Sequence, residues 1–270
     1  MNSNLINRIL TALVAGSASI AAIVLTPYGI WFFCFLVSML GLWEFLSVCG
    51  IQEKKYRFLL MGWGLGIWLM ALSEIISPGK GGALFIPWSL GLLPMLLLVL
   101  LFNPQETSPV PQIGIMVLGV VYPFLPLFLL FQIAVLNGVA QYDFWLPLGI
   151  LLMTWVLDSG AYFVGRWLGK RPLFPRISPK KTWEGSIGGA VFCLILAGVF
   201  QYFLSPVLYN WLIIGGIIAI FSQMGDLVES MFKRSMNIKD SGSILPGHGG
   251  MLDRFDGVYL SAPLIFLYFS

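Results

Sequence analysis

The chain has 270 residues, of which 58% are hydrophobic, 15% are aromatic and only 10% are charged. This charged share is less than half that of an ordinary soluble domain, so an independent water-soluble globule is excluded. Uncharged apolar stretches of about 18 or more residues recur along the chain, and each is long enough to cross a membrane as a helix. The low charge, the aperiodic glycines and the three cysteines also exclude disorder, collagen and a disulfide scaffold.

Charged residues and Pro/Gly clusters divide the chain into nine predicted membrane spans. Their predicted ranges are 8–26, 30–49, 57–76, 84–102, 113–136, 144–166, 186–204, 209–231 and 256–270. The first span lacks the basic lead and the cleavage pattern of a signal peptide. The last span is short, which predicts a helix that begins below the membrane surface and borders a polar cavity.

The basic residues predict the orientation of these spans. With nine spans, fourteen of the fifteen Lys and Arg residues fall on one side, and only Lys80 falls on the other. Because Lys and Arg are retained in the cytoplasm, the amino terminus is predicted inside and the carboxyl terminus outside. The net charge of +3 follows from this topology and indicates no nucleic-acid partner.

The two halves of the chain differ in where their carboxylates lie. Over residues 1–150, which form spans 1–5 and the start of span 6, acidic residues are almost confined to loops. The exceptions are Glu44 and Glu74, and we interpret both as interfacial. Over residues 151–270, carboxylates lie in or beside apolar helices, next to the basic loops 167–185 and 232–255. Carboxylates at membrane depth need metal ions, cations or water as partners, so the chemistry is predicted in the second half.

The sixth span carries a stripe made of Asp158, Tyr162 and Gly165, at positions i, i+4 and i+7. Residues at this spacing face the same neighbour on a helix. Two interpretations stay open at this point: a surface that faces substrate, or a helix-packing face with one paired aspartate.

The segment that leads into the seventh span combines hydroxyls, lysines and a carboxylate, in Ser178, Lys180, Lys181, Thr182 and Glu184. Ser178 or Thr182 is expected to cap the helix, and Glu184 suits its first turn. Lysines, hydroxyls and helix-start amides together also suit the oxygens of a phosphate group. A plain basic loop at the membrane surface is the alternative.

The eighth span ends with Asp226, Glu229, Ser230 and Lys233 on one face, at positions i, i+3, i+4 and i+7. The two acids lie deeper in the predicted span than the lysine. This order suits a cation held in the membrane beneath an anionic group at the surface, and a plain intrahelical ion pair is the alternative.

The loop that follows is rich in glycine and contains the only histidine of the chain, His248. Gly249 and Gly250 allow the backbone to approach a ligand closely. Asp253 and Asp256, at i and i+3, are predicted to open the last helix. Carboxylates without a nearby cysteine or second histidine favour Mg²⁺ over Zn²⁺.

These motifs strongly resemble those of the phosphatidate cytidylyltransferase family, also called CDP-diacylglycerol synthases. The family pattern runs from a serine through Lys-Arg, Lys-Asp, a small residue and a Pro-Gly turn to His-Gly-Gly and Asp-Arg-x-Asp. The matching residues are Ser230, Lys233, Arg234, Lys239, Asp240, Gly242, Pro246, His248, Gly249, Gly250, Asp253, Arg254 and Asp256. The segment 178–185, and Asp158 with Tyr162, are similar to upstream motifs of the family.

The resemblance implies an all-α integral membrane enzyme whose polar catalytic cavity is formed by the C-terminal helices and the cytoplasmic loops. The implied reaction joins CTP to phosphatidic acid, giving CDP-diacylglycerol and pyrophosphate in phospholipid biosynthesis. Mg²⁺ is the expected cofactor, with room for a second cation, and the implied metal ligands are Asp226, Asp253 and Asp256. The expected location is a bacterial inner membrane, with the active site facing the cytoplasm.

The resemblance also distributes the remaining motif residues between catalysis and substrate binding. The implied catalytic residues besides the metal ligands are Lys233, Arg234, Lys239, Asp240, His248 and Arg254. The implied substrate-binding residues are Asp158, Tyr162, Ser178, Lys181, Thr182, Glu184, Ser230, Gly249 and Gly250. The cations are assigned to phosphates of either substrate, and His248 to a phosphate oxygen or the departing pyrophosphate.

Three other functions are alternatives. The first is a related membrane cytidylyltransferase or kinase that acts on an isoprenoid lipid, and the second is a cation-coupled transporter. The acids of a transporter should be spread along a path through the membrane, whereas these cluster with cations on one side. A catalytically dead scaffold is the third, and the complete motif set disfavours it. Small residues on the spans permit a homodimer.

Overall fold

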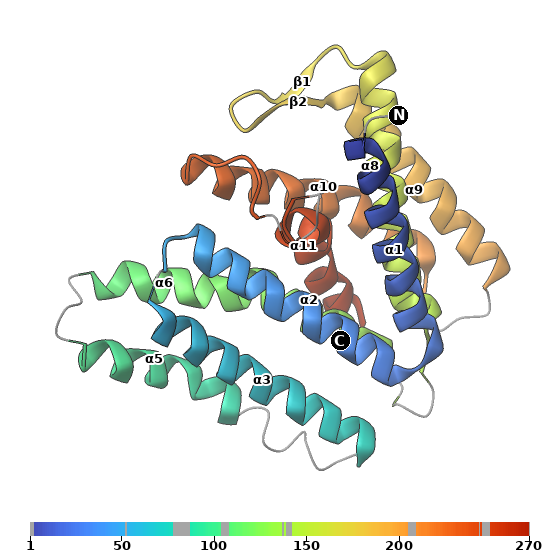
Figure 1. The fold of residues 1–270 in the computed structure, drawn as a ribbon. Coiled ribbons are helices and arrows are strands. Elements are labelled where there is room, and N and C mark those ends of the chain that lie inside the picture. The colour runs from blue at the N-terminus through green and yellow to red at the C-terminus, as the bar shows by residue number, and fades with distance from the viewer. Residues whose placement is uncertain are drawn as a thin grey trace.

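The computed structural model is a bundle of helices with one β hairpin at its end (Figure 1). It describes residues 3–51, 53–77, 87–103, 108–136, 138, 142–204, 209–242, 244 and 249–269, and side chains from residue 13 onward. Over these ranges the helices are α1 (Ser3–Leu25), α2 (Pro27–Val48), α3 (Lys54–Ile76), α5 (Leu92–Leu101), α6 (Pro109–Gly119), the π-helix η1 (Val120–Phe124), α7 (Leu125–Ala134), α8 (Trp145–Leu168), α9 (Trp183–Phe203), α10 (Trp211–Ser235) and α11 (Leu252–Phe269). The strands are β1 (Pro172–Phe174) and β2 (Ser178–Thr182).

Within the described residues, six helices are long and apolar enough to cross a membrane. They are Pro27–Val48, Lys54–Ile76, Pro109–Ala134, Trp145–Leu168, Trp183–Phe203 and Trp211–Ser235. These helices confirm a nearly all-α protein with several membrane helices. The predicted first, fourth and ninth spans are also helical, but they do not meet the same criterion, so the count of nine spans stays a prediction.

The hairpin between α8 and α9 departs from the all-α prediction. Its strands are antiparallel and pair Pro172 with Thr182. The first turn of α9 ties the hairpin down: Oε2 of Glu184 accepts hydrogen bonds from the backbone amides of Lys170 (3.0 Å) and Arg171 (3.2 Å). Prolines and exposed lysines hide the strand pattern in this segment, because prolines are depleted in strands and the hairpin has no buried face.

The helices α8 and α9 pack backbone to backbone. A Cβ atom added to Gly185 would lie 2.7 Å from the carbonyl oxygen of Ala161 and 2.9 Å from Cα of Gly165, closer than side chains pack. A Cβ on Gly189 would meet the carbonyl oxygen of Leu157 at 2.6 Å. Glycine therefore permits this approach, as it does in other membrane helix pairs. For the stripe of Asp158, Tyr162 and Gly165, a helix-packing face was one of the two interpretations, and Gly165 does pack against α9.

The helices α10 and α11 cross at another glycine contact. A Cβ on Gly225 would overlap the carbonyl oxygen of Asp256, and one on Gly257 would overlap Oγ of Ser222. This close crossing brings the acidic end of α10 next to the first turns of α11. The last helix begins at Leu252, earlier than the predicted start at residue 256.

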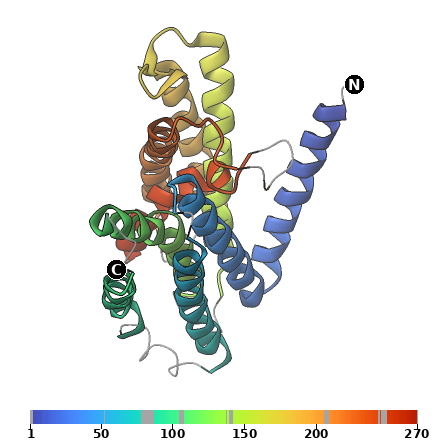
Figure 2. The same cartoon turned by 60° about the vertical axis from the view of Figure 1, so that its left-hand side comes forward.

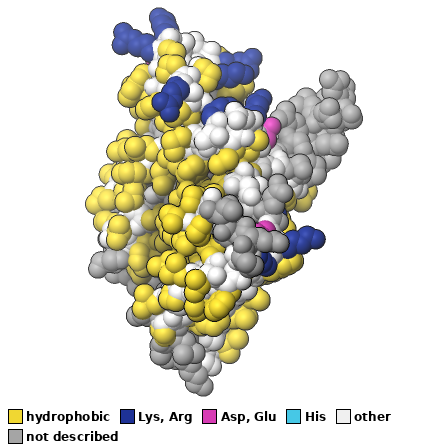
Figure 3. Space-filling model, turned by 90° about the vertical axis from the view of Figure 1, so that its left-hand side faces the viewer, with side chains coloured by type: hydrophobic (Ala, Val, Ile, Leu, Met, Phe, Trp, Pro, Cys, Tyr) yellow, Lys and Arg dark blue, Asp and Glu magenta, His cyan; other side chains and the backbone are white. Residues whose placement is uncertain are grey.

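The surface separates into an apolar middle and a basic end. Most Lys and Arg side chains visible in Figure 3 lie at the end that carries the hairpin, and hydrophobic side chains cover the middle. Helix α9 exposes many apolar side chains, among them Ile187 (61%) and Ile195 (59%). Such a surface is expected where a helix faces lipid or another membrane helix.

All three cysteines are free, which confirms packing in preference to disulfide pairing. Cys34 and Cys193 are completely buried, and Cys49 follows the last residue of α2.

Candidate active site

A cavity of about 1050 Å³ opens between α1, α2, α8, the hairpin, α10 and α11. Its polar wall includes Asp158, Lys181 and Asp226, and its apolar wall includes Phe33 and Leu36 of α2. The wall contributed by α1 consists of small residues, Ala15, Gly16, Ala18, Ser19 and Ala22. The N-terminal end of α1 leans away from the rest of the bundle in Figure 2. The first half of the chain therefore helps to form the cavity, which the motif positions did not indicate.

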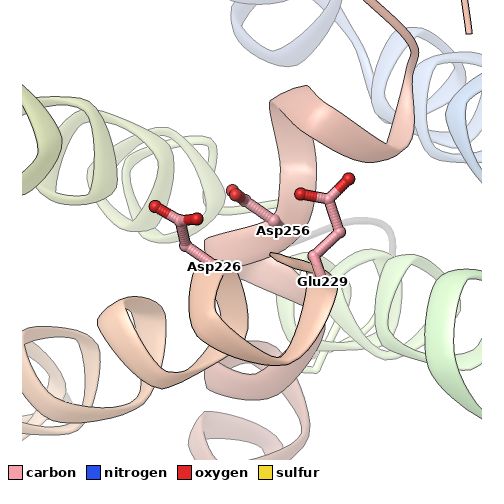
Figure 4. Close-up of side chains that lie close together, drawn as sticks. All are labelled: Asp226, Glu229 and Asp256. Carbon is pink, nitrogen blue, oxygen red and sulfur yellow. The ribbon is translucent and has the colours of Figure 1, made fainter. Parts of the chain in front are cut away.

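Three carboxylates from two helices converge beside this cavity. Asp226 and Glu229 of α10 and Asp256 of α11 have oxygen atoms that all lie within 4.8 Å of one another. Figure 4 shows the three side chains directed into the same space. The i and i+3 spacing on α10 places its two acids on one face, and the glycine contact with α11 brings the third acid to them.

Two lysines balance part of this negative charge. Lys181 of the hairpin forms an ion pair with Oδ2 of Asp226. Nζ of Lys233 lies 2.8 Å from Oε2 of Glu229 and 2.5 Å from Oδ1 of Asp253. The lysine on α10 thus forms the intrahelical ion pair that was the alternative interpretation of this face, and it also joins α10 to α11.

The carboxylate group fits a hard divalent cation. Glu229 is 2% exposed, and its Oε1 has no hydrogen-bond partner among the described residues. A buried carboxylate oxygen without a donor is costly, and a cation beside Asp226 and Asp256 would satisfy it. The potential ligands are all carboxylate oxygens, which Mg²⁺ and Ca²⁺ prefer.

Asp253 lies outside this group of three and has other partners. Its Oδ1 accepts from Lys233, while its Oδ2 accepts from the backbone amide of Ser241 (3.1 Å), from Oγ of Ser241 (3.0 Å) and from the amide of Gly250 (2.9 Å). Both oxygens are therefore engaged. This aspartate holds the residues before α11, and Glu229, which was not among the metal ligands expected from the sequence, lies next to Asp226 and Asp256.

Eight of the residues predicted for the site line this cavity. They come from α8, from the hairpin, from α10 and from the first turns of α11. Those residues are Asp158, Tyr162, Lys181, Thr182, Asp226, Asp253, Arg254 and Asp256. The hydroxyl of Tyr162 accepts a hydrogen bond of 2.9 Å from Arg166, and Oγ1 of Thr182 accepts one of 3.2 Å from the amide of Gly185, so Thr182 caps α9 as predicted.

The remaining predicted residues lie off the cavity wall. They are Ser178, Glu184, Ser230, Lys233, Arg234, Lys239, Asp240, Gly249 and Gly250. Ser230 donates to Oδ1 of Asp226 at 3.4 Å, and Arg234 donates to the carbonyl of Ile238 at 3.0 Å. Lys239 and Asp240 are exposed. His248 lies outside the described residues.

Two polar residues near the site were not identified from the sequence. Gln223 lines the cavity and donates to the carbonyl oxygens of Ser186 (3.0 Å) and Ala219 (2.9 Å). Glu44 was interpreted as interfacial, and this was wrong: the side chain is 4% exposed, and its Oε2 accepts from the amide of Leu252 at 2.8 Å. Only its position near the end of α2 marked it in the sequence, since its partner is remote in the chain.

Comparison with known proteins agrees with these motifs. A model described as "Cytidylyltransferase family" matches residues 6–270. A protein named phosphatidate cytidylyltransferase from Haemophilus influenzae is 32% identical over 97% of this chain and 97% of its own length. Proteins of the same name from Bacillus subtilis and Staphylococcus haemolyticus are 42% and 52% identical, over 65% and 42% of this chain and 64% and 45% of their own lengths. The chain belongs to the cytidylyltransferase family.

Proposed function

We propose that this protein is a phosphatidate cytidylyltransferase, which makes CDP-diacylglycerol from CTP and phosphatidate. The observation that carries the proposal is the single cavity in which lysine and arginine side chains, a carboxylate group and an apolar wall meet. A water-soluble triphosphate needs the charged part, and the acyl chains of a lipid need the apolar part. Relatives that carry this activity in their names support the same assignment.

In this reaction a phosphate oxygen of phosphatidate bonds to the α-phosphorus of CTP, and the bond to the bridging β-phosphate oxygen breaks, releasing pyrophosphate. The nucleophile is already an anion, so the main requirements are positioning and charge neutralisation. Lys181 and Arg254 line the cavity and would hold phosphate oxygens of the two substrates. Bound there, they would offset the repulsion between the two anionic substrates.

The metal ligands we propose are Asp226, Glu229 and Asp256, with Mg²⁺ as the ion. Mg²⁺ bound there would neutralise charge on the triphosphate and on the leaving pyrophosphate. Lys181 pairs with Asp226 and so offsets part of the negative charge of the carboxylate group. Lys233 does the same for Glu229 through its ion pair, and it leaves Oε1 of Glu229 free for the ion.

The orientation follows from the same charges. We propose that the basic end with the hairpin faces the cytoplasm of a bacterial cell, in the inner membrane, since CTP is a cytoplasmic compound and Lys and Arg are retained on that side. The cavity would then open to the cytoplasm at its charged end and to lipid beside α1. Helices before residue 150 would serve mainly as the membrane scaffold, and residues 151–270 would carry the catalytic groups. The exposed apolar face of α9 is a surface on which a homodimer would pack.

The test is the reaction itself with purified protein in detergent. We expect release of pyrophosphate and formation of CDP-diacylglycerol only when CTP, dioleoyl phosphatidate and Mg²⁺ are all present. Asp226→Asn should abolish the reaction because it removes a negative metal ligand. Asp143→Asn is the matched control, since Asp143 accepts a hydrogen bond of 2.6 Å from Tyr209 and neither residue lines the cavity.

Product formation with a polyprenyl phosphate or alcohol, and none with phosphatidate, would overturn the substrate assignment. Full activity of Asp226→Asn would overturn the metal site. Ion flux in liposomes without any nucleotide chemistry would support the transporter alternative instead.

A further inference from the structure

The carboxylate of Glu44 is buried at the start of the last helix. It belongs to α2, yet its Oε2 accepts a hydrogen bond of 2.8 Å from the amide of Leu252, the first residue of α11. Amides in the first turn of a helix have no partner within the helix, and a negative charge is favourable there. A residue of the N-terminal half therefore caps the helix that carries Asp253 and Asp256.

The second oxygen of Glu44 lies against two glycines of the segment that precedes α11. A Cβ atom on Gly242 or on Gly250 would overlap Oε1 of Glu44. Below, the segment before α11 means only the described residues Ser241, Gly242, Gly250 and Met251, and Glu44 contacts this segment at both glycines. A Cβ on Gly250 would also overlap Oγ of Ser241, so the structure leaves no space for a side chain at this position.

The segment held by Glu44 is connected to the carboxylate group by a chain of hydrogen bonds. The amides of Ser241 and Gly250 donate to Oδ2 of Asp253. Oδ1 of Asp253 then accepts from Lys233 (2.5 Å), which also donates to Oε2 of Glu229 (2.8 Å). A movement of the segment would therefore move Lys233 and turn Glu229 within the carboxylate group.

The electrostatic setting of Glu44 argues against a role in stability alone. No ion pair to Glu44 is found among the described residues, and a buried carboxylate without a cation costs stability. An apolar side chain would pack at lower cost in the same place. The buried charge of Glu44 therefore suggests that this side chain fixes a geometry that the site needs.

We propose that Glu44 is a positioning residue for the reaction, which fixes the segment before α11 and, through Asp253 and Lys233, the orientation of Glu229. The inference rests on the proposed function. The positioning role of Glu44 requires a side chain of this length with a hydrogen-bond acceptor at its end, because the contact to Leu252 uses a single oxygen.

The experiment compares three substitutions of this residue with a matched control. Glu44→Gln keeps the length and the acceptor oxygen, Glu44→Asp keeps the charge but shortens the side chain, and Glu44→Ala removes both. Ser38→Ala is the control, because Ser38 is a buried polar residue of the same helix that accepts from Nε1 of Trp68 (3.0 Å), away from the cavity lining. The measurements are kcat, the KM for CTP, the melting temperature, and hydrogen exchange of a peptide that covers 249–256.

We expect kcat to fall about ten- to a hundredfold in Glu44→Asp and Glu44→Ala, because displacements of about 1 Å have effects of that size. The KM for CTP should change little, and amide exchange in 249–256 should become faster in both. Glu44→Gln should stay close to the wild-type kcat and exchange rate. Ser38→Ala should lower the melting temperature without lowering kcat.

Two results would overturn the inference. Loss of kcat in Glu44→Gln with retention in Glu44→Asp would show that the charge matters and the position does not. A kcat in Glu44→Asp equal to that of Ser38→Ala would show that Glu44 serves stability only. If Glu44→Ala does not fold, the comparison of Glu44→Asp with Glu44→Gln decides alone. A wild-type protein that makes no CDP-diacylglycerol would refute the proposed function, and the exchange measurement would still test the contact.

Discussion

Replacing Gly225 by alanine tests whether the crossing of α10 and α11 sets the geometry of the carboxylates. The added methyl group would overlap the carbonyl oxygen of Asp256 and lie 3.1 Å from its carbonyl carbon and 3.3 Å from Cα of Gly257. All of these are backbone atoms, which cannot rotate away as a flexible side chain can. The two helices must therefore separate, and Asp226 moves away from Asp256.

The size of the effect follows from this overlap. A separation of roughly 1 Å between groups that must act together lowers kcat about a hundredfold. Stability should change much less, because overpacking costs about 1–3 kcal/mol while alanine gains about 1 kcal/mol over glycine in a helix interior. We therefore expect a nearly inactive protein that still folds and melts within a few degrees of the wild type.

The assay is CDP-diacylglycerol formation, run beside thermal unfolding in the same detergent. Gly216→Ala is the matched control on the same helix, because a Cβ there has no atom within 4 Å. It should keep wild-type activity and gain up to about 1 kcal/mol in stability. Wild-type activity in Gly225→Ala would refute the argument that this crossing positions the site.

Two further predictions concern charge and burial. Lys181→Met removes the cation paired with Asp226, so kcat should fall at least about tenfold through loss of a charge-assisted contact. Lys170→Met is the control, because Lys170 is exposed and does not line the cavity, and it should leave kcat unchanged. Equal activity of the two variants would show that Lys181 is not part of the site. Burial raises the pKa of Cys49 to about 11, and since the thiolate is the reactive form, only about one thiol in a thousand is reactive at pH 8. Iodoacetamide should modify Cys49 slowly at pH 8, and the rate should rise about tenfold for each pH unit toward 10. Mass spectrometry of the peptide that contains Cys49 measures this rate. A rate at pH 8 equal to that of the denatured protein would contradict the raised pKa.

The helices and the polar end of the cavity were predictable because their signals are local. Apolar stretches long enough to cross a membrane gave the positions of the helices, and i, i+3 and i+4 spacing placed Asp226 and Glu229 on one face of α10. The cap by Thr182 and the acidic first turn of α9 also follow from residues close in sequence.

The parts that were not predictable depend on contacts between distant segments. The hydrogen bond from Leu252 to Glu44 joins residues 208 positions apart, and no pattern near Glu44 reveals its partner. The same applies to Asp253, whose spacing from Asp256 suggested a shared metal ion. In the structure its oxygens accept hydrogen bonds from Lys233, Ser241 and Gly250, which only the fold brings to it.

The glycine contact between α8 and α9 has a consequence for how a substrate is received. Because the two helix backbones touch and Glu184 of α9 holds the start of the hairpin, we expect α8, α9 and the hairpin to move together. Lys181 would then already lie beside Asp226 when the proposed nucleotide substrate arrives. Little conformational entropy is then lost when the triphosphate binds, so more of the electrostatic attraction remains as affinity.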